Sequence, residues 1–376
     1  MVLRKKSLTC KTYKKKGGFF RMKKIVGILS AAAMATSMFA ADISAGTKIK
    51  GTLFQYKGSE ESISVLGQGN DSHDYANPNF VMSIGDDKAG AKVNITTDGN
   101  TTTTAMTTQT IWFKPIDALK ITIGNYDVAL NKETIDWTES FTGLGGNGYL
   151  VSVNVAGVSI DLGLNEGNGG AFWMTKGKEG DPTIANFFFK AGYSADFGNI
   201  GAYLAFNKKQ DPTHTWEITC GKYDLAEPMS STIKQMDFGV GYKNTFAPVT
   251  MFVNVVGHME KKFEWIRPEV FASGNIDAFG FSAFVAPIIY VDGDLNKDAE
   301  CELVAKLTYA MDACTPYVYF KDANLLNKKF VSQIKVGATG NCGLMGWNAC
   351  VQIDTGTGNN KDKVDVSVPV EFTVSF

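Results

Sequence analysis

Histidine is a common metal ligand and a common catalytic base, so the three histidines are the first candidates for chemistry. They are His73, His214 and His258, and they lie far apart in the sequence. None has the spacing of a zinc-binding pair, and none has an obvious nucleophile as a partner. We therefore interpret all three as solvated loop residues.

Loops that bind phosphate or dinucleotides are missing as well. The sequence contains no GxxxxGK[ST] motif and no GxGxxG motif that opens a helix. The sequence therefore predicts a protein that is not an enzyme and that carries no cofactor. A catalytic triad assembled from distant strands would escape this test.

One acidic stretch resembles the start of a calcium-binding loop, because oxygen ligands recur at every second position: Asp292, Asp294, Asn296 and Asp298. An EF-hand loop has glycine at position six and glutamate at position twelve. Here these positions hold Lys297 and Leu303. A solvated acidic loop is the better interpretation, and no metal site is predicted.

Charge is distributed unevenly along the 376 residues. Residues 1–40 hold 10 of the 37 Lys and Arg residues and no Asp or Glu. The remaining chain has 27 basic and 38 acidic residues, a net charge of −11. A nucleic-acid partner is not expected, because phosphate binding requires a basic surface.

The basic N-terminal region has the pattern of an export signal. Lys23 and Lys24 precede an apolar run over 25–33, and small residues follow. We predict a secretory signal peptide over 22–40, cleaved after Ala40 or, alternatively, after Ser37. Residues 1–21 are basic and patternless, and we interpret them as a non-native or untranslated extension. The mature domain is then 41–376.

The body of the chain alternates apolar and polar residues with a period of two. Over 364–376 every even position is Val or Phe, and every odd position is polar except Pro369. A period of two is typical of a strand with two different faces. Thirteen such residues would span about 43 Å, which is long for a globular strand.

Similar alternation predicts about eighteen strands, with sixteen as the alternative count. The ranges are 43–56, 78–85, 88–97, 104–113, 119–127, 147–155, 158–165, 184–194, 200–207, 234–243, 249–258, 265–274, 279–290, 300–310, 314–322, 329–339, 342–353 and 363–376. The connections alternate between mostly longer and short. The longest is 208–233, which could fold into the barrel or cover its rim.

If many strands with one apolar face formed a flat sheet in water, the apolar face of that sheet would be exposed to solvent. In a bilayer this apolar face is favourable, but every backbone polar group must be paired, so the sheet must close. An even strand number and alternating short turns and long loops fit such a barrel. We predict an all-β, transmembrane, antiparallel, up-and-down β-barrel. Aromatic residues near the short turns would lie at one membrane interface: Phe113, Tyr193, Tyr242, Phe281 and Tyr309.

At this point the sequence resembles the bacterial outer-membrane porins. The resemblance rests on the signal peptide, on the hairpin IWFKPIDALKITIGNYD (111–127), which is similar to hairpins in porin-like proteins including spirochaetal ones, and on the terminal strand VDVSVPVEFTVSF. In that strand Phe372, Val374 and Phe376 resemble the C-terminal signal read by the barrel-assembly machinery. The resemblance implies outer-membrane localisation, a lipid environment and, as one possible assembly, a homo-trimer.

If the apolar parity faces lipid, the opposite parity faces the lumen. The charged residues predicted to line the lumen are 11 basic and 7 acidic: Lys48, Lys50, Lys88, Lys92, Lys120, Asp161, Lys190, Asp237, Lys243, Arg267, Glu269, Glu300, Glu302, Lys306, Lys335, Lys363, Asp365 and Glu371. Basic residues outnumber acidic ones in this set, which hints at a mild preference for anions. A solvated wall of mixed sign is the plainer interpretation.

The favoured function is a porin that forms a water-filled channel for passive diffusion of small hydrophilic solutes and ions. A second hypothesis is a surface adhesin or antigen that binds host ligands through the long loops 57–77, 128–146, 166–183 and 208–233. A third is a soluble secreted β-protein, which would need no detergent.

Overall fold

The computed structural model describes residues 41–58, 62–67, 76–97, 104–131, 133–135, 138–139, 144, 146–165, 187–206, 236–260, 262–291, 298–326, 332–355 and 364–375. The predicted extension 1–21 and signal peptide 22–40 lie outside these residues. So do loop 208–233, His73, His214, Phe376 and most of the acidic stretch that begins at Asp292.

The described residues form strands and no helix. The strands are β1 (Ala41–Lys57), β2 (Ser62–Gly67), β3 (Ala76–Gly85), β4 (Ala89–Thr97), β5 (Thr104–Ile116), β6 (Leu119–Tyr126), β7 (Thr134–Ile135), β8 (Thr138–Glu139), β9 (Gly146–Val155), β10 (Val158–Asn165), β11 (Phe187–Ala195), β12 (Gly198–Phe206), β13 (Met236–Phe246), β14 (Val249–Met259), β15 (Phe263–Ile276), β16 (Phe279–Tyr290), β17 (Glu300–Tyr309), β18 (Thr315–Asp322), β19 (Ser332–Cys342), β20 (Met345–Thr355) and β21 (Val364–Ser375). Among these residues, no helix could cross a membrane.

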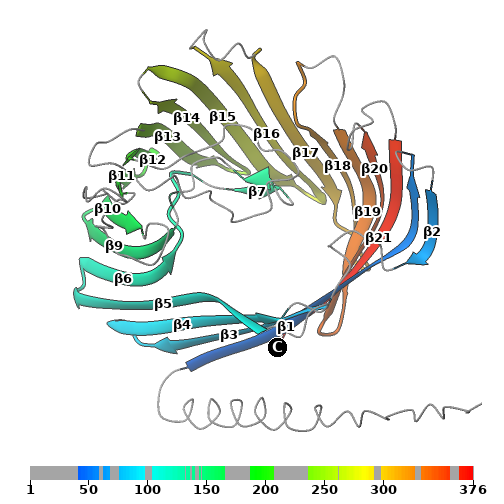
Figure 1. The fold of residues 1–376 in the computed structure, drawn as a ribbon, viewed down its shortest axis with the longest axis horizontal. Helices are drawn as coiled ribbons and strands as arrows, with labels where there is room; N and C mark the ends of the chain where they lie inside the picture. The colour runs from blue at the N-terminus through cyan, green and yellow to red at the C-terminus, as the bar shows by residue number, and fades with distance from the viewer. Residues whose placement is uncertain are drawn as a thin grey trace, which may run out of the picture.

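The sheet closes into a barrel of eighteen antiparallel strands (Figure 1). From β3 to β21 each wall strand pairs with the next, with β6 followed directly by β9. The first strand closes the ring, because β1 pairs with β21 on one side and with β3 on the other. The all-β barrel class is confirmed, and the strand number is eighteen, not sixteen.

Neighbouring residues on the wall differ sharply in exposure. Val253 and Val270 are register partners on β14 and β15, and each is 38% exposed. The next pair along, Asn254 and Glu269, is fully buried. This alternation places an apolar residue outside and a polar residue inside, the arrangement that a bilayer requires and that water disfavours.

The aromatic residues beside the short turns lie largely on the outer surface. Phe113, Tyr193 and Tyr309 are 39–45% exposed. The ring of Tyr309 packs against Phe279, with 4.7 Å between ring centroids. Their amphipathic or aromatic rings are suited to the headgroup region of a membrane.

Two predicted loops contain strands. Within 57–77, β2 pairs with the C-terminal half of β1, beyond the point where β3 begins. Within 128–146, β7 and β8 form a short hairpin. The ladder is irregular near Pro369, because the β1–β21 register shifts between Thr52, which faces Pro369, and Gln55. Proline has no N–H to donate to the ladder.

Candidate functional site

The described part of the connection between β6 and β9 enters the barrel, and we call its described residues, 127–131, 133–135, 138–139 and 144, the inward segment. Figure 1 shows its strand β7 inside the ring of wall strands. There β7 contacts β16 and β17. The segment is closed at its base by a hydrogen bond from the backbone N–H of Leu144 to the carbonyl of Val128, at 2.6 Å. The interior of the barrel is therefore the candidate site, and this segment shapes it.

Apolar contacts hold the base of the inward segment to the wall. Val128, Leu130 and Leu144 are at most 9% exposed. They belong to one cluster with wall residues of β9, β11, β12 and β14–β16: Leu150, Phe188, Tyr203, Ala205, Val256, Trp265 and Ile288. Burying three aliphatic side chains contributes about 1.5–3 kcal/mol each, as an upper estimate. This burial favours the inward position.

Two wall glycines make room for this contact. Gly201 on β12 and Gly241 on β13 are register partners. A Cβ atom at Gly201 would lie 2.7 Å from Cδ1 of Leu130, and one at Gly241 would lie 2.9 Å from Cδ2 of the same residue. Any side chain at either position would therefore collide with Leu130. The glycine pair creates the space in which the segment lies.

Polar contacts fix the position of the segment. Asn131 donates a side-chain hydrogen bond to Oδ1 of Asn254 at 2.9 Å, and Asn254 donates one to the carbonyl of Asn131 at 3.2 Å. Asn254 also donates to Glu269 at 3.0 Å. Glu133 forms an ion pair with Lys243 on β13. Buried amides paired on both sides define one position more narrowly than apolar contacts do.

The tip of the segment meets a second apolar cluster on the inner wall. Ile135 of β7 is 2% exposed. Its cluster is aromatic for the most part and consists of Phe252, Phe271, Phe284, Ala286, Val304, Tyr317, Tyr319 and Cys350. From the sequence, the alternate strand positions that these residues occupy were predicted to face a polar lumen. The inner wall of these strands instead carries apolar residues beside polar ones such as Asn254.

Beside these clusters lies a buried network of charges. Arg267 is fully buried, and its Nη2 lies 3.0 Å from Oε2 of Glu302, while its Nε lies 3.5 Å from Oε1 of Glu269. Lys321 lies 3.3 Å from the other oxygen of Glu302. Opposite charges balance within this group of four. Arg267 and Glu302 were predicted to face lumenal water, but both are buried and paired.

Other predicted lumenal charges make lighter contacts. Lys190 pairs with Asp161 across β10 and β11 at 3.3 Å, with both side chains partly exposed. Three lysine ammonium groups lie 4.7–5.0 Å from aromatic ring centroids, which are the pairs Lys120–Trp112, Lys306–Tyr317 and Lys335–Tyr319. Lys92 is exposed. Lys48 and Lys50 lie on β1 opposite Thr373 and Glu371, and their side chains lie outside the described residues.

The interpretation of His258 as a solvated loop residue was wrong. His258 lies in β14 and is 3% exposed. Its Nδ1 lies 2.5 Å from Oδ1 of Asp237, another residue predicted to face open water. The two are register partners on β13 and β14, a relation that depends on strand pairing across 21 residues of sequence.

Sequence reasoning missed Asn131, Glu133, Asn254 and Lys321. Each is polar, and none is part of a motif. The available signal was indirect: apolar residues on the otherwise polar parity of neighbouring strands, such as Phe252 and Phe271. These indicate that something apolar packs inside the barrel.

The sequence matches no family model, and no curated protein matches it. Solved structures are similar in fold. OccAB4 of Acinetobacter baumannii is 8% identical, with a TM-score of 0.53, over 89% of this chain and 98% of that one. OpdQ of Pseudomonas aeruginosa is 9% identical, with a TM-score of 0.51, over 89% and 97%. The anion-selective porin from Comamonas acidovorans is 9% identical, with a TM-score of 0.49, over 89% and 100%.

The chain has a porin-type barrel fold. Identities this low show the fold alone. The spirochaetal resemblance stays a prediction.

Proposed function

We propose that the mature chain is an outer-membrane porin, a water-filled channel for passive diffusion of small hydrophilic solutes and ions. The observation that supports this most directly is the inward segment in a closed barrel of eighteen strands. Barrels of 16–18 strands are wide enough for an aqueous channel. The segment fills part of that width and leaves a narrower passage, which limits the size of solutes that pass.

The segment contacts the inner wall from β9 to β17, so the open passage lies along the remaining strands. Among the predicted lumenal charges on those strands, the basic residues Lys48, Lys50, Lys88, Lys92, Lys120, Lys335 and Lys363 outnumber the acidic residues Asp365 and Glu371. Arg267, Glu302 and Asp237 are buried in pairs and contribute little field to the water. A basic wall lowers the free energy of anions, so a mild anion preference follows.

Passive diffusion requires no catalytic residue and no cofactor, and we propose neither. The adhesin hypothesis relied on four long loops, and the described residues of one of them, 128–146, pack inside the barrel. In 57–77, β2 is paired to the wall. Loops 166–183 and 208–233 lie outside the described residues.

Export and assembly belong to the same proposal. The signal peptide 22–40 directs secretion, and the terminal strand presents Phe372, Val374 and Phe376 to the barrel-assembly machinery. Pairing of β21 with β1 supports a role for this strand in closure. The homo-trimer rests on the resemblance alone, and chemical cross-linking of the protein in native membranes tests it.

Liposome swelling tests the proposed function. Vesicles with the refolded mature chain are placed in isotonic solutions of sugars of increasing size. The proposal predicts swelling rates that fall steeply with sugar size and do not saturate with concentration. Swelling no faster than protein-free vesicles, with a heat-modifiable folded barrel present, would overturn it.

A further inference from the structure

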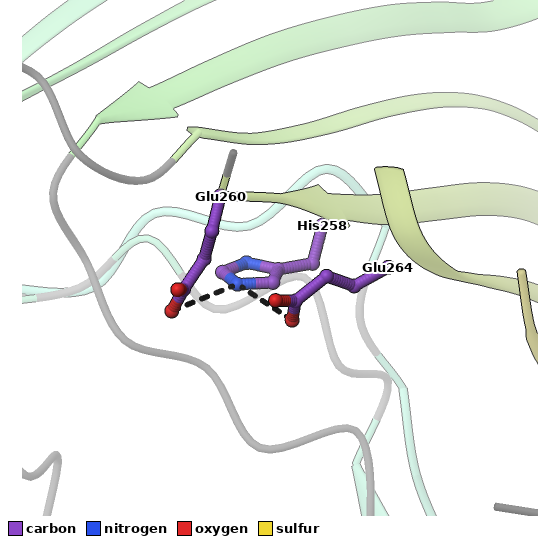
Figure 2. A group of neighbouring side chains, drawn as sticks. All are labelled: His258, Glu260 and Glu264. Atoms are coloured by element: carbon purple, nitrogen blue, oxygen red, sulfur yellow. Dashed lines mark ion pairs between the residues drawn. The ribbon is translucent and has the colours of Figure 1, made fainter. Parts of the chain in front are cut away.

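A histidine and two glutamates meet at one end of the β14–β15 hairpin (Figure 2). Nε2 of His258 lies 3.6 Å from Oε2 of Glu264 and 3.9 Å from Oε1 of Glu260. Both distances exceed hydrogen-bonding length. The three donor atoms all lie within 4.8 Å of one another. A buried imidazole nitrogen therefore faces two carboxylates without a hydrogen bond to either.

A β-bulge brings Glu264 to this place. His258 pairs with Trp265, but Met259 pairs with Phe263, so Glu264 is the extra residue of β15. In a regular ladder Glu264 would point away from the face that carries Trp265, because side chains alternate. A bulge re-aims a side chain in this way. Glu264 thereby joins His258 on the inner face.

Two further contacts hold the imidazole in place. Asp237, 1% exposed, lies 2.5 Å from Nδ1 and holds the ring by this nitrogen, so Nε2 is the nitrogen that faces the glutamates. The ring stacks on Trp265 with an interplanar angle of 14°. A carboxylate on the far nitrogen is the usual second partner of a metal-binding histidine, since it sets the tautomer and raises basicity.

We propose that His258, Glu260 and Glu264 bind a divalent transition-metal ion of the Zn²⁺ type, with Asp237 as the residue that positions His258. Zinc bonds of about 2.1 Å place neighbouring donor atoms about 3.0–3.5 Å apart. The carboxylates need to approach Nε2 by only a few tenths of an ångström, and the side chain of Glu260 is 44% exposed. The imidazole favours zinc over Ca²⁺ or Mg²⁺, which prefer oxygen ligands alone.

The proposed site is linked to the inward segment. Trp265, on which His258 stacks, belongs to the cluster that holds Val128, Leu130 and Leu144. Metal binding at this end of β14–β15 therefore adds a crosslink beside the contact that keeps the segment inside the barrel.

Isothermal titration of the untagged, detergent-solubilised mature chain with Zn²⁺, after EDTA treatment, tests the proposal. We expect one saturable site. Glu264→Gln and His258→Gln should each weaken it by at least tenfold, and Asp237→Asn by about 10–100-fold. Matched controls are His214→Gln, another of the chain's histidines, and Asp298→Asn, an exposed acid outside the cluster. Ca²⁺ should compete only weakly.

Zinc binding is measured without any reading of ion conductance, so a failure of the metal site can be distinguished from a failure of the proposed channel function. If a variant does not fold, as judged by gel mobility before and after boiling, Co²⁺ absorption of the wild-type chain supplies a second measurement. The expected result is a visible ligand-field band that Zn²⁺ removes. No saturable Zn²⁺ binding, or equal binding by the Glu264→Gln and Asp298→Asn chains, would overturn the proposal.

Discussion

Gly241 offers the sharpest test of the inward segment. A Cβ atom there would lie 2.3 Å from Oδ1 of Asn254, 2.7 Å from Nδ2 of Asn131 and 2.9 Å from Cδ2 of Leu130. Real Cβ contacts do not come this close, so Gly241→Ala forces the side chains of Asn131 and Leu130 away from the wall and disrupts the hydrogen bonds between Asn131 and the wall residue Asn254. Overpacking of this kind costs about 1–3 kcal/mol. That cost shifts the balance between the bound and released segment by about 5–150-fold.

The measurement is single-channel current through planar bilayers. We expect Gly241→Ala to show a larger mean conductance or frequent transitions to a larger level, because the segment leaves the passage part of the time. Gly51→Ala is the matched control, since a Cβ atom at Gly51 meets nothing within 4 Å. If the Gly241→Ala channel is folded and its current and noise match those of the Gly51→Ala channel, the assigned role of the segment is wrong.

Three further predictions concern the wall. Arg267→Met leaves Glu269 and Glu302 buried without the cation between them. The free energy of unfolding, measured in urea titrations followed by tryptophan fluorescence, should fall by about 3–5 kcal/mol. A loss below about 1 kcal/mol would contradict the stabilising role of this charge network. Val253→Arg places a charge in the apolar band and should lower the free energy of unfolding in vesicles by about 2–4 kcal/mol. Val155→Arg, beside a short turn, should lower it by only about 0–1 kcal/mol. Equal losses would argue against this placement of the wall in the membrane. Lys243→Glu opposes Glu133 with a like charge, so reversal potentials in a salt gradient should move toward cations, and an unchanged potential would exclude Lys243 from the ion path.

The wall could be predicted from the sequence because a bilayer imposes a period of two on every strand. Val253 and Asn254 show the pattern in a single step, with one exposed and the next buried. Strand number followed from counting such segments. The boundaries were less accurate where a strand continues into a loop, as in β1 and β2.

The interior could not be predicted in the same way, because its contacts join residues that are distant in sequence. Gly201 and Gly241 form one space for Leu130 only because β12 and β13 pair side by side, which the sequence does not show. Asn131 and Asn254 are separated by 123 residues. The sequence offered 208–233 as a connection that could fold inward or cover the rim, and these residues lie outside the described ones. The structure shows an inward position for the described part of the connection after β6.

The environment of His258 could not be predicted from the sequence for a related reason. Its partners come from three sources: Asp237 by strand pairing, Glu260 by the hairpin and Glu264 by a bulge. Sequence spacing rules for metal sites assume regular strands or helices, and a bulge breaks that assumption. Only the register reveals that the three side chains converge.

The central claim is that this barrel encloses a continuous path for water and ions. Planar-bilayer recording of the refolded mature chain tests it most directly. The account predicts discrete current steps that rise in proportion to salt concentration, with a reversal potential that shows mild anion preference. A correctly folded, membrane-inserted barrel that gives no current above the bare bilayer would contradict it.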